Sequence, residues 1–286
     1  MNNKLTIILV SFFSTNRIKK ILNKINSNNK IIIVENSLSN QFKQYIESNY
    51  RNVKVLIPKK NLGNGGGINF AIKKIKTKFA LYLDIDVTIT HKTIKKLYQV
   101  AEKKKHWAII APNLKGIKYK KEFFLKKNFC PNISEMSFVE GCSLLFNVQV
   151  IKKIGLFDEK FFLYYEENDL FFRCLKKNKK ILMLNNVYVK HANNNGSDKK
   201  YDKYIDDIRN WHLMWSKFYF YKKNFSFLRG VLETYKSFIS SFIKTIYYYL
   251  INKKEFKKYY NRFSGLLNSY IGKQSWKRVK IIHENI

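Results

Sequence analysis

Residues 81–89 have the sequence LYLDIDVTI, an apolar strand-like run with two acids, Asp84 and Asp86, in its middle. Aspartate is depleted in strands, and an unpaired buried carboxylate is costly enough to need a compensating partner. Side chains alternate across a strand, so we expect both carboxylates to point to the same side. Two carboxylates on one side at a strand end predict a seat for a divalent cation, whereas a solvated turn is the simpler interpretation of an isolated D-x-D.

The composition is that of a globular and strongly basic protein. The chain has 286 residues, 45% of them hydrophobic, which allows one large domain or one domain with an appendage. Its formal net charge is +35, carried by 48 Lys and only 7 Arg. Because forked recognition of bases and phosphates favours Arg, the charge favours an anionic lipid surface or a phosphorylated substrate over nucleic acid. A basic nucleic-acid-binding protein remains the alternative that is not an enzyme.

The cysteines and the N-terminal segment bear on the compartment. Cys130, Cys142 and Cys174 are odd in number and lack metal-ligand spacing, which fits a reducing cytoplasm rather than a disulfide framework or a zinc site. The apolar start leads into Asn, Arg and Lys rather than a small-residue cleavage site, so we expect a first buried strand there. We expect no spanning helix, because no stretch reaches roughly 18 uninterrupted apolar residues.

The first 86 residues alternate between short β-rich runs and helix-like segments. We expect strands over residues 4–12, 30–35, 53–57 and 79–86, and helices over 16–28, 41–50 and about 67–76, the last after a glycine-rich loop. This alternation predicts an α/β fold with a mostly parallel central sheet covered on both faces. Ligands bind beyond the carboxyl ends of the strands in such sheets, where Asp84 and Asp86 lie.

The C-terminal part has a different pattern. From about residue 204 onward, apolar and aromatic residues recur at three- and four-residue intervals, which predicts a helical region. The loop-like HANNNGSDKK, residues 191–200, separates the two patterns. We therefore divide the chain into an α/β domain over residues 1–203 and a helical, basic and aromatic region over residues 204–286.

A glycine-rich segment, NLGNGGGINFAI, occupies residues 61–72. Glycines let a backbone approach a ligand closely, and free N–H groups at a helix start favour an anion. Neither G-x-G-x-x-G nor G-x-x-x-x-G-K-[ST] is present, so a flexible turn that precedes a helix is the alternative interpretation.

An acidic cluster, Glu166, Glu167 and Asp169, stands at the expected start of a helix in residues 161–178. The helix dipole favours carboxylates there, and Arg173 is placed to pair with Asp169. The aromatic residues before the acids would reduce solvation and raise a carboxyl pKa toward that of a general base. One of the three acids is therefore a candidate catalytic residue.

His191 ends a strand-like segment, VYVKH, before a polar loop. A single histidine at such a position fits a hydrogen-bonded structural residue. Next to two aspartates it also fits a metal ligand.

Taken in order, these segments resemble family 2 glycosyltransferases of the GT-A fold, a Rossmann-like nucleotide-diphospho-sugar transferase fold, and most of all bacterial rhamnosyltransferase-like enzymes. The resemblance rests on VEN (34–36), NLGNGGGIN (61–69), LDID (83–86), GLFDEKFFLYYEENDLFFR (155–173), HANNNGS (191–197) and NWHLMWSKFYFYKKN (210–224). It covers nearly the whole chain and makes residues 1–203 the expected catalytic domain.

The resemblance implies an inverting glycosyltransferase that moves a sugar, rhamnose or another hexose, from a dTDP- or UDP-linked donor. The implied acceptor is a cell-surface polysaccharide or a lipid-linked glycan, and the implied cofactor is Mg²⁺ or Mn²⁺. Asp86 would bind the metal, Asp84 would lie nearer the ribose, and His191 would be a further ligand. The residues expected to bind substrate are Ser11, Glu35, Asn36, Asn61, Gly63, Gly66, Asn69, Asp84 and Gly141.

Two positions depart from the family pattern. Glu35 replaces the commoner Asp, which leaves the base selectivity open. Glu167 stands where the family has the aspartate that acts as base, and a single base is sufficient for inversion at the sugar carbon. Glu167 is thus the first candidate base, with Glu166 and Asp169 as rivals.

Two further alternatives stay open at this point. A sugar nucleotidyltransferase would share the sheet and the metal acids, but it requires a glycine-rich signature after the first strand, where SFFSTNRIK has none. A membrane-surface scaffold without activity would not need the metal, base and loop residues.

The C-terminal region also carries a location signal. An apolar stripe of residues at helical spacing is flanked by lysines; it consists of Phe238, Ile239, Phe242, Ile243, Ile246, Tyr249 and Leu250. The stripe fits packing on the catalytic domain or peripheral docking on the anionic inner face of the cytoplasmic membrane. We expect docking there, with a lipid-linked acceptor.

Overall fold

The computed structural model describes residues 4–25, 29–192 and 202–279, which form two compact units. The first unit contains the described residues up to Phe157 and those from Leu170 to Ala192. The second contains Asp158–Asp169 and the described residues from Asp202 on. The segment that carries the acidic cluster thus belongs with the C-terminal helices. Most of the loop that we used as a boundary, near residue 200, lies outside the described residues.

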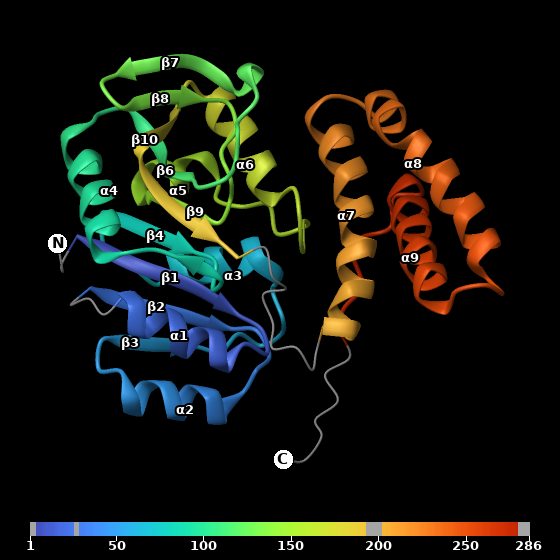
Figure 1. The fold of residues 1–286 in the computed structure, drawn as a ribbon, viewed down its shortest axis with the longest axis horizontal. Helices are drawn as coiled ribbons and strands as arrows, with labels where there is room; N and C mark the ends of the chain where they lie inside the picture. The colour runs from blue at the N-terminus through green and yellow to red at the C-terminus, as the bar shows by residue number, and fades with distance from the viewer. Residues whose placement is uncertain (1–3, 26–28, 193–201, 280–286) are drawn as a thin grey trace. The chain divides into compact units, whose positions relative to one another are not determined.

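The first unit is built on a ten-stranded sheet with the order β3-β2-β1-β4-β9-β6-β10-β8-β7 and β5 paired to β10 (Figure 1). The strands are β1 (Leu5–Ser11), β2 (Lys30–Glu35), β3 (Val53–Leu56), β4 (Phe79–Leu83), β5 (Val87–Thr88), β6 (Trp107–Leu114), β7 (Phe124–Cys130), β8 (Ile133–Met136), β9 (Ser143–Asn147) and β10 (Lys180–His191). Strands β1 to β4 pair in parallel, and β9 lies antiparallel between β4 and β6. Because β6 pairs in parallel with β10, the strands β1, β2, β4 and β10 all end at the same edge of the sheet.

Helices cover both faces of this sheet, as the alternating pattern predicts. The helices of this part of the chain are α1 (Thr15–Ile25), α2 (Asn40–Asn49), α3 (Gly63–Ile72), α4 (His91–Lys103), α5 (Val148–Ile154) and α6 (Glu166–Lys176), with a short 3₁₀ turn at Lys121–Phe123. Ile7 of β1 belongs to the core that contains residues of α1, α2 and α4, whereas Ile8 belongs to the core beneath α3 and α5. Neighbouring side chains of one strand therefore enter two cores, which confirms the expected α/β fold.

Helix α3 begins earlier than expected, at Gly63 rather than near residue 67. A side-chain carbon added to Gly67 would lie 3.0 Å from Val10 Cγ1, so the glycines allow the helix to lie close to β1. The low helix propensity of glycine misled the sequence prediction, because packing decides the conformation here.

The strand expected over residues 79–86 is also shorter, since β4 ends at Leu83. The N–H of Val87 donates to the carbonyl oxygen of Asp84 at 3.1 Å, which closes a turn between β4 and β5. Asp84 and Asp86 therefore lie in a turn beyond the strand end, not within a strand.

The second unit contains the helices α7 (Asp202–Asn224), α8 (Phe227–Tyr248) and α9 (Lys253–Tyr270), as the three- and four-residue spacing predicts. Helices α7 and α9 approach closely at Gly265, where an added side-chain carbon would overlap the backbone carbonyl of Trp211. Trp211 also donates to Ser264 at 3.3 Å. The chain after α9 returns to α7, because Trp215 Nε1 donates to the carbonyl of Lys273 at 3.0 Å.

This contact makes Gly265 a test of the helix packing. We expect Gly265→Ala to lower the free energy of unfolding by about 1–3 kcal/mol, since overpacking forces the helices apart. By contrast, alanine in place of glycine at an open helix position stabilises by roughly 1 kcal/mol. Urea denaturation measures the free energy of unfolding of Gly265→Ala. Lys257→Ala, a change at an exposed position of the same helix, is the control and should alter this free energy little. A more stable Gly265→Ala protein would contradict the close approach.

Candidate functional site

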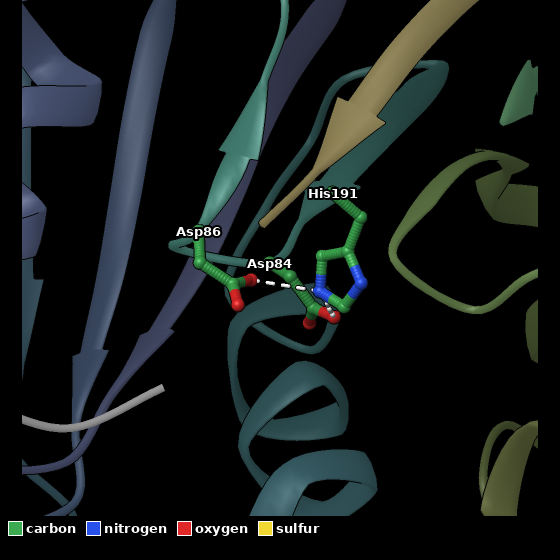
Figure 2. A group of neighbouring side chains, drawn as sticks. All are labelled: Asp84, Asp86 and His191. Atoms are coloured by element: carbon green, nitrogen blue, oxygen red, sulfur yellow. Dashed lines mark ion pairs between the residues drawn. The ribbon is translucent and has the colours of Figure 1, made fainter. Parts of the chain in front are cut away.

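Asp84, Asp86 and His191 come together at the carboxyl edge of the sheet (Figure 2). His191 Nε2 lies 2.8 Å from Asp86 Oδ1 and 3.6 Å from Asp84 Oδ2. Among the described residues, this is the group of acidic, histidine or cysteine side chains whose ligand atoms lie within 4.8 Å of one another. The two acids and the histidine are more than one hundred positions apart in the sequence, so the strand order brings them together.

Backbone hydrogen bonds hold both halves of this cluster. The N–H of Asp84 donates to the carbonyl oxygen of Cys142 at 2.9 Å, next to β9. His191 lies opposite Val87 in the pairing of β10 with β5, and the N–H of Ala192 donates to the carbonyl oxygen of Asp86 at 3.3 Å. The turn after β4 is therefore fixed on two sides by segments from distant parts of the chain.

The electrostatics of Asp84 favour a cation. Burial raises the pKa of Asp84 to about 6, and the nearby Asp86 adds to that rise, while the hydroxyl of Tyr82 and the charge of His191 oppose it. About one third of the Asp84 side chain nevertheless remains accessible, so a ligand can reach it. Tyr82 donates to the Asp84 carboxylate, and its hydroxyl also lies 2.8 Å from Asn64 Oδ1 of α3.

The donor set fits a divalent cation. Two carboxylates and one imidazole supply hard oxygen ligands and one nitrogen ligand, whose separations a single ion can bridge. An ion at this position would compensate the charge of the two neighbouring acids and favour their ionised forms. His191 thus supplies one partner for the paired aspartates, and a bound cation would supply the other.

Ser11 and Glu35 end the neighbouring strands β1 and β2 and lie opposite each other in the parallel register. Both are buried, and burial raises the pKa of Glu35, while hydrogen bonds with Ser11 and Ser37 lower it. The N–H of Ser37 donates to Glu35 Oε1 at 2.9 Å. The structure thus brings together two of the residues expected to bind the nucleotide, at the edge where Asp84 also lies.

Asn36 and Asn61 shape the start of α3. Asn36 Nδ2 donates to the carbonyl oxygen of Gly63 at 2.9 Å, and its Oδ1 accepts from the N–H of Leu62 at 3.2 Å. Asn61 Oδ1 accepts from the N–H of Gly63 at 2.9 Å. These asparagines therefore fix the position of the glycine-rich turn next to the ends of β1 and β2.

The other residues expected to bind substrate have different surroundings. Gly66 is buried in α3, and Gly141 directly precedes Cys142, whose carbonyl holds Asp84. The buried side chain of Asn69 donates to the carbonyl oxygen of Phe157 at 2.9 Å and accepts from its N–H at 3.0 Å. The observed partner of Asn69 is thus the backbone of the chain itself.

The three acids of the acidic cluster in the second unit differ in how far their side chains are buried. Glu166 is 3% exposed and Asp169 is fully buried, whereas Glu167 keeps part of its surface accessible. Just before the acids, Tyr164 and Tyr165 have φ angles of 65° and 66°. Two consecutive side-chain-bearing residues in the left-handed region cost of order 1–3 kcal/mol each, and such strain concentrates at functional sites.

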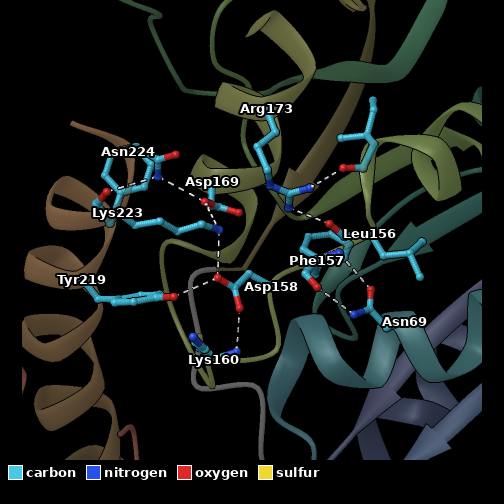
Figure 3. A network of polar contacts seen from close by, with 12 residues as sticks. Asn69, Leu156, Phe157, Asp158, Lys160, Asp169, Arg173, Tyr219, Lys223 and Asn224 are labelled. Carbon is cyan, nitrogen blue, oxygen red and sulfur yellow. Dashed lines mark hydrogen bonds and ion pairs between the residues drawn. The ribbon is translucent and has the colours of Figure 1, made fainter. Parts of the chain in front are cut away.

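A polar network anchors this acidic segment to α7 (Figure 3). Lys223 Nζ lies 2.7 Å from Asp169 Oδ1 and 2.8 Å from Asp158 Oδ2. Asn224 Nδ2 donates to Asp169 at 3.1 Å, and the hydroxyl of Tyr219 donates to Asp158 at 3.1 Å. One lysine therefore joins the carboxylates at both ends of Asp158–Asp169.

Sequence spacing predicts Arg173 as a partner of Asp169. The structure shows an ion pair of Asp169 with Lys223, more than fifty residues away. The guanidinium of Arg173 donates to the carbonyl oxygens of Ile154 and Leu156 at 3.2 and 2.6 Å. Leu156 has a φ of 59°, so Arg173 stabilises an unusual backbone conformation after α5.

Sequence reasoning missed three supporting residues. Tyr82 has the apolar spacing of a buried strand, and Lys223 belongs to one of many lysine pairs, so neither carried a distinguishing signal. Burial raises the pKa of Glu140, and the nearby charge of His191 opposes this rise. Its position next to Gly141 was the signal that could have identified it.

Comparisons with known proteins agree on one family. The model of glycosyl transferase family 2 matches residues 6–163. The low-salt glycan biosynthesis hexosyltransferase Agl10 of Haloferax volcanii is 25% identical over 198 residues, which cover 62% of this chain and 64% of that protein. The match therefore spans less than two thirds of the length of this relative.

Solved structures agree on the fold. The mannosyltransferase PcManGT from Pyrobaculum calidifontis, in complex with GDP-Man and Mn²⁺, aligns with a TM-score of 0.56 at 8% identity over 94% of this chain and 87% of that chain. S. aureus TarS 1-349 in complex with UDP-GlcNAc aligns with a TM-score of 0.52 at 16% identity over 94% and 92%. The first unit has the GT-A fold, as the resemblance predicted.

The group formed by Asp84, Asp86 and His191 at the sheet edge predicts metal binding. We expect Asp86→Ala to abolish the binding of Mn²⁺ in isothermal titration calorimetry and to change the thermal unfolding of the metal-free protein little, since the lost contact with His191 is offset by relief of the repulsion between Asp86 and Asp84. Glu122→Ala removes an exposed carboxylate of the same unit and should bind Mn²⁺ normally. If Asp86→Ala binds Mn²⁺ as tightly as the wild type, the metal site lies elsewhere.

The polar network predicts a pH-dependent loss of stability. Lys223→Met leaves Asp158 and the buried Asp169 without their shared cation, so we expect the free energy of unfolding to fall by about 3 kcal/mol at neutral pH. Burial by itself raises the pKa of Asp158, but hydrogen bonds from Lys223 and the N–H of Lys160 bring it below its usual range. The effect should be complete above about pH 4 and shrink as the pH falls through the lowered pKa of Asp158.

Urea denaturation between neutral and acidic pH measures this difference. Lys222→Met, a change of the exposed neighbouring lysine, serves as the control and should have little effect at any pH. A loss of stability that is equal for both variants, or independent of pH, would contradict the proposed pairing.

Proposed function

The chain belongs to glycosyl transferase family 2, and from this membership we propose that it is an inverting glycosyltransferase that transfers a hexose from a nucleoside-diphosphate sugar to a glycan acceptor. The observation that carries the proposal is the cluster of Asp84, Asp86 and His191 at the carboxyl edge of the sheet, beside the ends of β1 and β2. Ligands of open α/β sheets bind at this edge, where the strand order reverses between β1 and β4.

The nucleotide would lie across the ends of β1 and β2. Ser11, Glu35 and Asn61 are the residues proposed to contact it, and the glycine-rich start of α3 lets the backbone approach the diphosphate. A UDP- or dTDP-linked sugar is the proposed donor, and rhamnose is the first candidate among the hexoses. The complexes of PcManGT with GDP-Man and of TarS with UDP-GlcNAc support a nucleotide-sugar donor of this general class.

The proposed cofactor is a divalent cation held by Asp86, Asp84 and His191, which would neutralise the charge that develops on the departing nucleoside diphosphate. Carboxylates suit both Mg²⁺ and Mn²⁺, whereas the imidazole of His191 favours Mn²⁺. Mn²⁺ is therefore the first candidate. Tyr82 supports the site by orienting the Asp84 carboxylate.

Glu167 is the proposed base. The acceptor hydroxyl must reach the carboxylate that takes its proton, and Glu167 is the most accessible of the three acids. Asp169 is buried and held by Lys223, which suits a structural role, and Glu166 is 3% exposed. In this proposal Glu167 accepts the proton while the acceptor oxygen attacks the sugar carbon from the face opposite the diphosphate.

The acceptor is proposed to be a cell-surface polysaccharide or a lipid-linked glycan. The name of the Agl10 relative, a hexosyltransferase of glycan biosynthesis, supports a glycan acceptor. The peripheral membrane location expected from the C-terminal region favours the lipid-linked form.

A screen of sugar nucleotides tests the activity. The wild-type chain should release nucleoside diphosphate from one of a panel of UDP-, dTDP- and GDP-sugars when Mn²⁺ is present and not after chelation. With that donor, Glu167→Gln should keep the donor-induced thermal shift but lower turnover by about 10² or more, the usual scale for losing a general base.

The rival acids provide the controls. Glu166→Gln should retain most of the turnover, because the proposal gives it no proton to accept. If Glu166→Gln is inactive and Glu167→Gln is active, then Glu166 rather than Glu167 is the base. If no donor of the panel binds or turns over in the presence of Mn²⁺, the proposed function fails.

A further inference from the structure

One side of α8 presents a continuous apolar surface to solvent. Its defining residues, exposed by 47–89%, are Leu232, Ile239, Phe242, Ile243 and Ile246 of the helix and Leu250 in the turn that follows it. The spacing of three, four and seven residues places the helical ones on one side of α8, and we term this side, together with Leu250, the outer face of α8. Single exposed apolar residues are ordinary on a protein surface, whereas a contiguous stripe of this length marks an interaction site.

The opposite side of α8 already supplies the packing of the second unit. Gly230 lies against Phe218 of α7, where an added side-chain carbon would approach the ring to 2.8 Å. The hydroxyl of Thr234 lies 2.8 Å from that of Tyr270, and the rings of Phe238 and Phe263 are 5.0 Å apart. The helix is therefore held by its inner side, and its outer face is available to a partner.

Aromatic residues flank the C-terminal end of this face. Tyr247 and Tyr249 are 61% and 67% exposed where α8 leads into α9, beside the exposed Ile251. Tyrosine combines an apolar ring with a polar hydroxyl and is enriched where an apolar phase meets water. Such a belt is more typical of a surface that contacts lipid headgroups than of a purely apolar protein interface.

The charge of this region decides which partner fits. Residues 227–260 contain seven Lys or Arg and two Glu. Both acids pair within their own helices, Glu233 with Arg229 at 2.6 Å and Glu255 with Lys258 at 2.9 Å. The exposed Lys253, Lys254 and Lys257 follow directly after the outer face. A second copy of this chain would bring like charges together, whereas an anionic lipid surface provides both the apolar layer and the opposite charge.

We propose that the outer face of α8 and the lysines at the start of α9 dock on an anionic phospholipid surface, with α8 lying in the plane of the headgroups. The described part of the chain contains no helix with the length and apolar character needed to cross a bilayer. An amphipathic helix with cations at its edge binds parallel to the surface instead. This docking would give a peripheral location on the inner face of the cytoplasmic membrane, and it goes beyond the proposed transfer activity.

Flotation of the full-length chain with vesicles tests the proposal. The wild type should float with vesicles of phosphatidylcholine and phosphatidylglycerol at low salt, float less at high salt, and stay unbound with phosphatidylcholine alone. Lys253→Gln/Lys254→Gln should lower the partition coefficient about 10- to 30-fold, since each cation near an anionic surface contributes about 1 kcal/mol. Its control is Lys95→Gln/Lys96→Gln, an exposed adjacent lysine pair of α4, which should bind as the wild type does.

The apolar contribution requires its own pair of variants. Ile243→Ser/Ile246→Ser should lower partitioning by about tenfold or more, because two exposed side chains no longer enter the lipid interface. Leu125→Ser/Tyr188→Ser replaces residues of similar exposure in the first unit and should leave partitioning unchanged. Thermal unfolding and Mn²⁺ binding of each variant verify that the fold is intact.

Three results would overturn the docking surface. The first is that the wild type does not float with anionic vesicles at low salt. The second is that Ile243→Ser/Ile246→Ser floats as well as the wild type, and the third is that the two lysine-pair variants lower partitioning equally. Sedimentation velocity distinguishes the rival occupant: a dimer that Ile243→Ser/Ile246→Ser dissociates, together with absent flotation, would assign the face to a second copy. Since flotation needs no donor, its failure beside intact Mn²⁺-dependent turnover rejects the docking alone.

Discussion

The candidate site of the first unit depends on the convergence of Asp84, Asp86 and His191, since two neighbouring carboxylates in a partly buried turn repel each other unless an opposing charge lies near them. Tyr82 donates to one acid, His191 approaches both, and burial still raises the pKa of Asp84 to about 6. The remaining demand for positive charge is what makes the site a receptor for a cation. Backbone hydrogen bonds with Cys142 and Ala192 fix this turn and so hold the two carboxylates close together.

In the second unit, two buried or partly buried acids are neutralised by a lysine of the chain itself. Asp158 and Asp169 receive their counter-charge from Lys223, so their charge is satisfied within the protein and the segment between them is restrained at both ends. Glu167 lies within that restrained segment and keeps an accessible surface. Acids with an internal cation serve structure, and acids that retain access can meet a ligand. This distinction separates Asp169 from Glu167 more clearly than sequence spacing does.

Much of this arrangement could be predicted from local patterns. The strands near residues 5–11 and 30–35 and the C-terminal helices follow from side-chain periodicity, because each residue's environment is set by its own element. Asp84 and Asp86 were identified from two acids in an apolar strand-like run and His191 from its place at a strand end, and the family resemblance then gave them roles. The early start of α3 was missed because contact with Val10, not propensity, favours helical glycines. The pairing of Lys223 was missed because a contact across more than fifty residues leaves no periodic trace.

The insertion of β9 antiparallel between β4 and β6 has a consequence for how the sheet is completed. Strand β10 can bring His191 to the turn after β4 only when β6 and β9 already occupy the positions between them. These pairings join segments far apart in the chain, and contacts of this kind form slowly. A cation bound by all three ligands would therefore bind only chains in which β10 is in register, and it would stabilise that state by mass action. Metal availability would thus act on the yield of correctly assembled sheet as well as on turnover.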